Sequence, residues 1–135
     1  MSDIIRAMAF IFGCIGTRLA LAAVARAYGD NTRRDSTAVR YGLALTSTII
    51  AVGLFYHYAF GTRPVAFEAG GAVWWNRLRP VHAALHLLFA IAIVAPSSFA
   101  RRAWLILVVD AMLGLAAWVA HRSTGVVFGH AAGRV

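Results

Sequence analysis

The chain has 135 residues, of which 61% are hydrophobic and 13% charged, and its mean hydropathy is +0.72. A soluble domain of this length cannot bury so many apolar side chains, so the composition excludes an aqueous monomer. Arginine is the source of all the positive charge behind the net charge of +8, and the absence of lysine excludes Schiff-base chemistry and a P-loop. The single cysteine, Cys14, excludes an internal disulfide and a multi-cysteine metal site.

The apolar residues fall into four blocks, each near the length of a helix that crosses a hydrocarbon core of about 30 Å. These blocks are residues 4–28, 40–60, 80–95 and 103–121. Their ends are marked by residues that stop or start helices, namely Gly29, Asp30, Gly61, Pro80 and Pro96. We therefore predict an all-α membrane protein with four transmembrane helices in an up-and-down bundle, in a single domain with both termini on one side.

The first block could also be read as a cleaved signal peptide, because small residues at positions 20–23 resemble a cleavage site. Arg18 would interrupt the apolar stretch of such a peptide, and Asp3 weakens the basic region that should precede it. We expect this block to remain as a span. It carries a stripe of small residues of the kind that lets helices approach one another, either inside the bundle or against a partner: Ala9, Gly13, Gly16, Thr17 and Ala20.

Arg18 lies near the middle of the first block, where a charged side chain costs at least about 2.5–3.5 kcal/mol. Asp110 is the only acidic residue inside any of the four blocks, and counting about 1.5 Å per residue places it at a depth that the Arg18 side chain can reach. We predict an intramembrane ion pair between the first and fourth helices. This pair either fixes the register of the helices or forms a relay in which Asp110 takes up a proton or ion.

The 19-residue connection between the second and third blocks ends in a segment rich in tryptophan and arginine. Indole rings settle at the level of lipid headgroups, and guanidinium groups bind phosphate. We predict an interfacial loop over residues 61–79 that anchors the chain and holds an anionic, cardiolipin-like phospholipid through Trp74, Trp75, Arg77 and Arg79. The arginines are divided equally between the two sides, so they predict neither an orientation nor binding of nucleic acid.

Four histidines are expected toward the side of the termini, and two of them, four residues apart, share a helix face: His57, His82, His86 and His121. Such a set could hold haem, a metal or a quinone head group. We predict no metal site, because Cys14 and Asp110 are expected to lie deeper than the imidazole rings. The alternative is that all four are interfacial histidines with one polar end in water.

The stretches Phe12 to Arg18, Trp74 to His82, and Asp110 with Gly114-Leu115 resemble an uncharacterised family of small four-span membrane proteins. This family is encoded by giant DNA viruses and by some algae and protists. The resemblance covers the membrane core but not the tail, and it implies a four-span fold but no activity. The positions that it carries over are Arg18, Asn76, Arg79, His82 and Asp110.

The sequence shows no pair of carboxylates and no nucleophile with a base at matched depth, so we predict that the chain is not an enzyme. The tail over residues 123–135 has no evident fold, and a neighbouring protein is the simplest partner to order it. Our first hypothesis is therefore a non-catalytic accessory subunit that packs against other membrane subunits. The arginine-rich composition and the resemblance suggest a mitochondrial inner or plastid membrane.

Two other hypotheses remain open at this point. One is a small homo-oligomeric ion or proton channel that uses Arg18 and Asp110. The other is a haem- or quinone-binding membrane protein that uses His57, His82 or His86.

Overall fold

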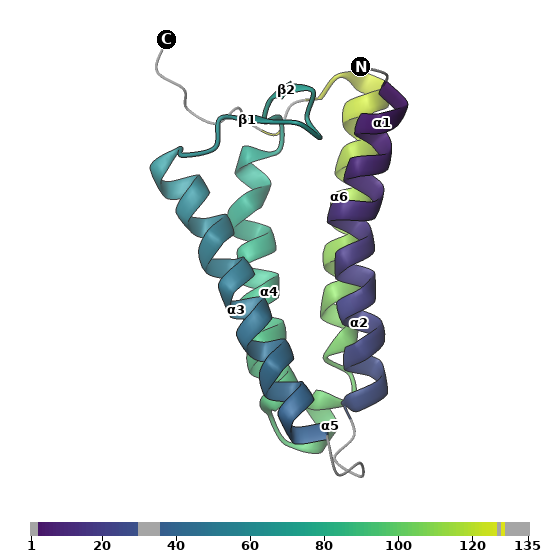
Figure 1. The fold of residues 1–135 in the computed structure, drawn as a ribbon, viewed down its shortest axis with the longest axis vertical. Coiled ribbons are helices and arrows are strands. Elements are labelled where there is room, and N and C mark those ends of the chain that lie inside the picture. Colours follow the sequence, from purple (N-terminus) through teal and green to yellow (C-terminus); the bar gives the residue numbers. More distant parts are fainter. Residues whose placement is uncertain (1–2, 30–35, 127, 129–135) are drawn as a thin grey trace.

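The computed structural model describes residues 3–29, 36–126 and 128, and it consists of four long helices that run antiparallel to their neighbours (Figure 1). The first is a continuous helix made of α1 (Asp3–Met8), a π-helical segment η1 (Ala9–Gly16) and α2 (Thr17–Tyr28). The others are α3 (Ser36–Phe60), α4 (Arg79–Val94) and α6 (Trp104–Thr124). The predicted all-α four-helix bundle is confirmed, and all four helices are long and apolar enough to cross a membrane.

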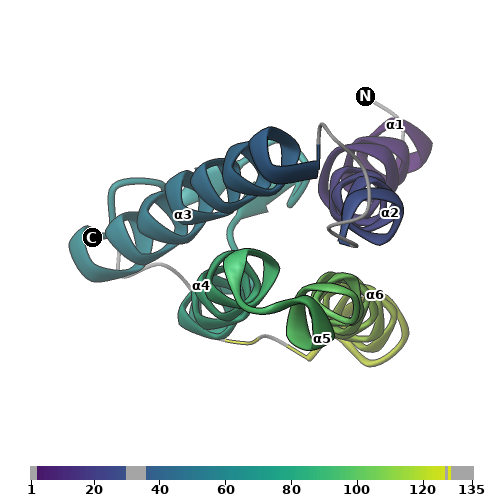
Figure 2. The same ribbon diagram turned by 90° about the horizontal axis from the view of Figure 1, so that it is seen from below.

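The helices form two pairs, α3 with α4 and α2 with α6, and the pairs meet where α4 packs on α6. A short helix, α5 (Ser97–Ala100), joins α4 to α6 at one end of the bundle, which we call the α5 end. The pairs lie close together there and separate toward the opposite end, where α1 begins and α6 finishes (Figure 1). Seen from below, α4 lies between α3 and α6, and α3 leans away from the other helices (Figure 2).

The end opposite α5 is closed by residues 61–78, which we call the cap segment. It contains a two-stranded antiparallel hairpin, β1 (Val65–Ala66) and β2 (Gly71–Ala72), and a single turn of 3-10 helix, η2 (Asn76–Leu78). The cap segment packs onto the helices through aromatic rings, since the Trp74 indole stacks on the His121 imidazole with 4.2 Å between ring centroids. The predicted loop is therefore a folded element that covers the bundle.

The α5 end is held together by an apolar cluster, with side chains from all four long helices and from the residue just before α6: Ala22, Ala25, Leu43, Phe89, Ile93, Ala103 and Leu107. The alanines of α2 let the neighbouring helices approach closely. Gly29 extends this close approach, because a Cβ atom at that position would lie 2.6 Å from the Ala100 backbone oxygen.

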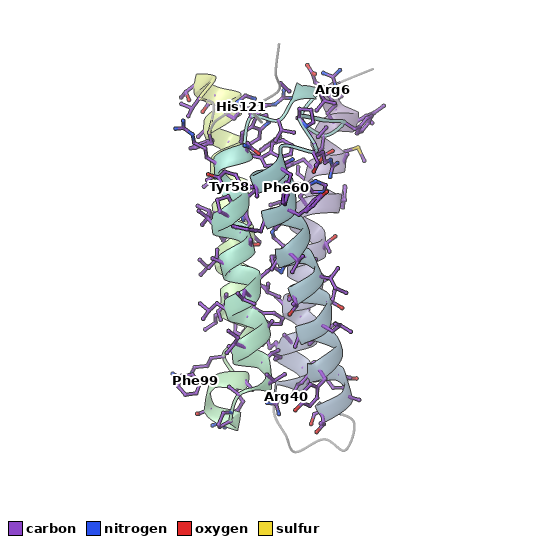
Figure 3. The ribbon with its side chains drawn as sticks, turned by 90° about the vertical axis from the view of Figure 1, so that its left-hand side faces the viewer. Arg6, Arg40, Tyr58, Phe60, Phe99 and His121 are labelled. Carbon is purple, nitrogen blue, oxygen red and sulfur yellow. The ribbon has the colours of Figure 1, made fainter. Side chains whose placement is uncertain are left out.

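Two buried arginines tie α3 and α4 together at opposite ends. Arg40 of α3 donates from Nε to the Ile93 backbone oxygen over 2.6 Å and from Nη2 to the Ala95 oxygen over 2.7 Å, near the α5 end (Figure 3). Arg79 of α4 donates from Nη1 to the His57 oxygen over 3.4 Å, at the other end. The last carbonyls of a helix have no partner within the helix, so each arginine satisfies groups at the C-terminus of the neighbouring helix.

Some boundaries differ from the prediction. α3 begins at Ser36, four residues before the expected start at position 40, and α6 continues to Thr124. It stops there because Gly125 takes the left-handed conformation, with φ at 70°, that commonly ends a helix. The tail beyond these positions falls largely outside the described residues, so its expected contact with a neighbouring protein stays a prediction.

Candidate functional site

A network of polar side chains surrounds Asp110, which is fully buried near the middle of the bundle. The Arg18 Nε of α2 donates to its Oδ2 atom, so the predicted ion pair is present. His82 Nδ1 of α4 lies 2.5 Å from Oδ1, and His86 Nε2, one turn further along α4, lies 3.5 Å from Oδ2. The Asp110 carboxylate therefore joins α2, α4 and α6.

With both imidazoles neutral, these contacts select one tautomer of each. A carboxylate only accepts hydrogen bonds, so His82 carries its proton on Nδ1 and presents Nε2 as an acceptor. On His86 the Nε2 proton faces Asp110, and Nδ1 lies 3.2 Å from the Ser47 hydroxyl, which donates to it. Ser47 adds α3, so this Asp110 network, made of Arg18, Ser47, His82, His86 and Asp110, contacts all four long helices.

Gly114 makes room for His82 one turn beyond Asp110. A Cβ atom on Gly114 would lie 3.7 Å from the His82 Cε1 atom and 3.3 Å from Ile15 Cδ1. The imidazole edge therefore lies directly against the α6 backbone. This close contact lets His82 Nδ1 reach the Asp110 carboxylate.

The π-helical segment η1 brings further groups to the network. Arg18 donates from Nη1 to the Cys14 backbone oxygen over 2.6 Å, and the Thr17 hydroxyl donates to the Gly13 oxygen over 2.6 Å. Single turns of π-helix occur frequently at functional sites. The wider turn was not predicted from the sequence, and it changes which residues of the first helix face the bundle interior: Phe10 and Ile15 are buried in η1, whereas a Cβ atom on Gly13 would meet open space.

A cavity of about 120 Å³ adjoins the network on the side of the cap segment. Its polar lining comes from Cys14, Arg18 and His82, and from His57, Arg63, Glu68 and Arg79 nearer the cap segment. Aromatic and apolar side chains complete the wall, namely Phe10, Ile15, Leu54, Trp74, Trp75, Leu78 and Ala117, together with Gly114. Arg63 and Glu68 form an ion pair of 3.2 Å, so their charges neutralise one another.

Along the helix axes, the residues that line the cavity and those of the apolar cluster lie on opposite sides of Asp110. On each helix the residues that line the cavity lie on the cap side of the network, whereas the apolar cluster lies on its α5 side. On α6, for example, Ala117 lines the cavity and Leu107 belongs to the cluster. The α5 half of the bundle is thus closed by this cluster, and the cap half holds the cavity beside a second, smaller apolar cluster of Phe10, Ile15 and Ala111.

The four histidines differ in their partners and in their burial, and a shared ligand for them stays a prediction. His57 Nδ1 lies 2.8 Å from the Thr62 hydroxyl near the cap segment, and His121 stacks on Trp74. His82 and His86 are buried, with 5% and 1% of their surface exposed, so they are not interfacial. His82 and His86 lie on the buried face of α4, whereas Val81 and Ala84 in the same two turns are exposed.

The predicted headgroup site is wrong for two of its four residues. Trp74, on the inner side of the cap segment, is 4% exposed, and Arg79 is 3% exposed. Arg79 donates to the Asn76 side-chain oxygen over 2.9 Å and to the Arg63 backbone oxygen over 3.0 Å, which leaves its guanidinium no face toward lipid. Trp75 is half-buried, whereas Arg77 is exposed, so a contact between Arg77 and a phospholipid stays a prediction.

Haem does not fit these residues. Both nitrogens of His86 face Ser47 or Asp110, and His82 has only Nε2 left for a ligand. A cavity of about 120 Å³ is also smaller than the 300–1,000 Å³, in round numbers, of ordinary ligand pockets. Within the described ranges, no group of three His, Cys, Asp or Glu side chains is placed to hold a metal ion.

Sequence reasoning missed Ser47 and Glu68 as parts of the site. Ser47 lies between two threonines, Thr46 and Thr48, and no pattern distinguishes it from them before the packing of α3 is known. Glu68 lies within the predicted interfacial loop over residues 61–79, and the sequence does not indicate that a hairpin in this loop folds back over the helices. Comparisons of the chain with protein-family models, with curated proteins and with solved structures find no match.

Proposed function

We propose that this chain is a multi-pass membrane protein that binds a small single-ring ligand, of the quinone or phenol class, in the cavity beside Asp110. The observation that carries this proposal is the cavity itself, which joins a buried Arg–Asp–His network inside an otherwise apolar bundle. An ionisable group placed at the depth of a membrane is costly, and such groups usually mark sites of binding or transport.

The size of the cavity supports a ligand with one ring. An engineered apolar cavity of about 150 Å³ in another protein binds benzene, so a cavity of 120 Å³ has room for about one six-membered ring. Phe10 and Trp75 provide aromatic surface against which such a ring can pack. Arg18 and His82 provide polar groups for an oxygen substituent on the ring.

A purely structural role would not require the cavity. A buried ion pair adds little net stability compared with apolar packing, and a network that only fixes helix register can be enclosed completely. The α5 half of the same bundle is enclosed in this way, by side chains such as Phe89, Ile93 and Leu107, which are fully buried. The cap half departs from that pattern where Arg18 and His82 line the cavity.

The position of the apolar cluster on the α5 side of Asp110 also argues against the channel hypothesis. A conducting path through the interior of a single bundle would have to continue from Asp110 toward the α5 end, where the apolar cluster lies. Charged groups cross apolar packing only at high cost, so this arrangement favours a site entered from one side.

Binding is tested with a short-chain quinone added to the purified protein in detergent, because a quinone ring in the cavity quenches the fluorescence of Trp74 and Trp75. We expect Ala117→Leu, which fills the cavity, to weaken the dissociation constant at least tenfold. The matched control is Ala116→Leu, because Ala116 is exposed on the outer face of α6. Equal affinity in the two variants would show that the quinone binds elsewhere and would overturn the proposal.

A second candidate is the accessory subunit of a larger membrane complex, in a mitochondrial or plastid membrane and with bound lipid. It is favoured by the open space around Gly13, Gly42 and Gly53, where an added Cβ would meet no atom within 4 Å. Small residues on an outer helix face allow another helix to approach. Extraction in mild detergent, followed by native gel separation and mass spectrometry, tests this candidate, and migration of the chain alone counts against it.

A further inference from the structure

We propose that His82 accepts a proton from a ring hydroxyl group of the bound ligand, so that a phenol or hydroquinone is held in the cavity as its anion. This inference rests on the proposed binding function and adds a proton-transfer step to it. It is carried by the position of His82, which contacts the buried Asp110 carboxylate through Nδ1 and also lines the cavity.

The His82 imidazole is oriented as a general base. Asp110 accepts the hydrogen bond from Nδ1, which leaves the unprotonated Nε2 to take up a proton. A buried carboxylate in this position holds the imidazole in one tautomer and stabilises the imidazolium when it forms. Gly114 keeps the ring against α6, so the orientation is also fixed by packing.

The proton step is balanced within the cavity. The O–H bond of the ligand breaks, its electron pair stays on the oxygen, and the proton forms a new N–H bond at His82 Nε2. Asp110 stabilises the resulting imidazolium, and the guanidinium of Arg18, which lines the same cavity, stabilises the oxyanion. The transfer needs no oxidant, because no electron leaves the ligand.

The other ionisable groups around the cavity are less suited to this role. Both nitrogens of His86 already face Ser47 or Asp110. The Nδ1 of His57 faces the neutral hydroxyl of Thr62, whereas that of His82 faces the Asp110 carboxylate. Glu68 of the cap segment is paired with Arg63, and Arg79 donates to backbone and side-chain oxygens. Cys14 of η1 also lines the cavity, but a thiol sulfur is only a weak hydrogen-bond acceptor.

The test uses 4-nitrophenol as the probe, because its phenol and phenolate forms absorb at different wavelengths. The purified full-length chain is titrated with the probe at a pH where the free probe is mainly the neutral phenol. We expect binding to raise the phenolate absorbance, and we expect His82→Gln to reduce the phenolate fraction of the bound probe about tenfold or more, as for a change of one unit in an apparent pKa. Ala116→Leu, which changes an exposed residue on the outer face of α6, is the control.

A second variant keeps the test decisive if His82→Gln does not fold. Asp110→Asn retains the shape of the side chain and removes the charge that stabilises the imidazolium, so it should also lower the phenolate signal while tryptophan quenching still reports binding. Binding without phenolate in the unaltered protein would overturn this inference and leave the proposed function intact. The same phenolate signal in His82→Gln would overturn it too. Absence of any bound probe or quinone would overturn the binding proposal itself.

Discussion

The carboxylate of Asp110 is the group on which the charged and polar side chains inside the bundle converge. It is fully buried and contacts one guanidinium and two imidazoles, which come from α2 and α4. Each partner would be costly to bury alone, since an unpaired polar group away from water loses its hydration without replacement. The stability of the cap half of the bundle therefore depends on this residue.

We predict that Asp110→Ala lowers the free energy of unfolding by about 3–5 kcal/mol, because it leaves the largely buried Arg18 guanidinium without its counter-charge. The double variant Arg18→Met with Asp110→Ala should recover part of this loss, since it removes the uncompensated charge. Unfolding of the purified chain by a denaturing detergent measures both values. A double variant less stable than Asp110→Ala would show that Arg18 contributes by packing and not by its charge.

Gly29 shows a steric requirement at the scale of one residue. A Cβ atom there would lie 2.6 Å from the Ala100 oxygen and 2.9 Å from the Ala25 oxygen, and both are backbone atoms that cannot move alone. We predict that Gly29→Ala destabilises the chain by about 1–3 kcal/mol through overpacking. Gly53→Ala is the control, because a Cβ there meets open space, and it should be neutral or slightly stabilising within a helix.

At the scale of elements, α3 and α4 are joined by arginines in a reciprocal arrangement. Arg40, near the start of α3, donates to carbonyl groups at the end of α4, and Arg79, at the start of α4, donates to the end of α3. A positive charge at a helix C-terminus also interacts favourably with the helix dipole. The two contacts hold the ends of an antiparallel pair in register.

We predict that Arg40→Met destabilises the chain by about 1.5–3 kcal/mol, because two hydrogen bonds from a charged donor are lost while the apolar stem is kept. Arg101→Met provides the control, since Arg101 is exposed just before α6 and its replacement should change the stability by less than about 0.5 kcal/mol. Detergent-induced unfolding measures the difference. Equal effects would mean that the carbonyl contacts of Arg40 are not stabilising.

At the scale of the whole molecule, the bundle is asymmetric along its length. Apolar packing closes the α5 end, and the cavity lies toward the cap segment. The helix pairs separate in that direction (Figure 1). The single native cysteine, Cys14, lines this cavity and reports on access to it.

We predict that a small methanethiosulfonate reagent modifies Cys14 at least about tenfold faster than a cysteine placed at Leu107 in a Cys14→Ser background, because only the first position adjoins the cavity. The rates are followed by mass spectrometry of the folded protein. Ala117→Leu should slow the modification of Cys14, whereas the exposed Ala116→Leu should not. Similar rates at positions 14 and 107 would contradict the division of the interior.

The sequence alone determined the number and approximate ends of the helices, because lipid-length apolar blocks and helix-stopping residues are local features. It also predicted the contact between Arg18 and Asp110, since depth along a helix follows from counting residues and few charges were available to pair. The family resemblance, the organelle and the partner subunits stay predictions.

Only the tertiary structure decided which polar residues meet. Depth alone grouped His57 and His121 with His82 and His86, but the direction in which each side chain points depends on how the helices rotate and pack. The fold-back of the cap segment buried Trp74 and Arg79, and the π-helical turn redirected the first helix. These features arise from contacts between segments far apart in the chain, so no local pattern encodes the cavity that they enclose.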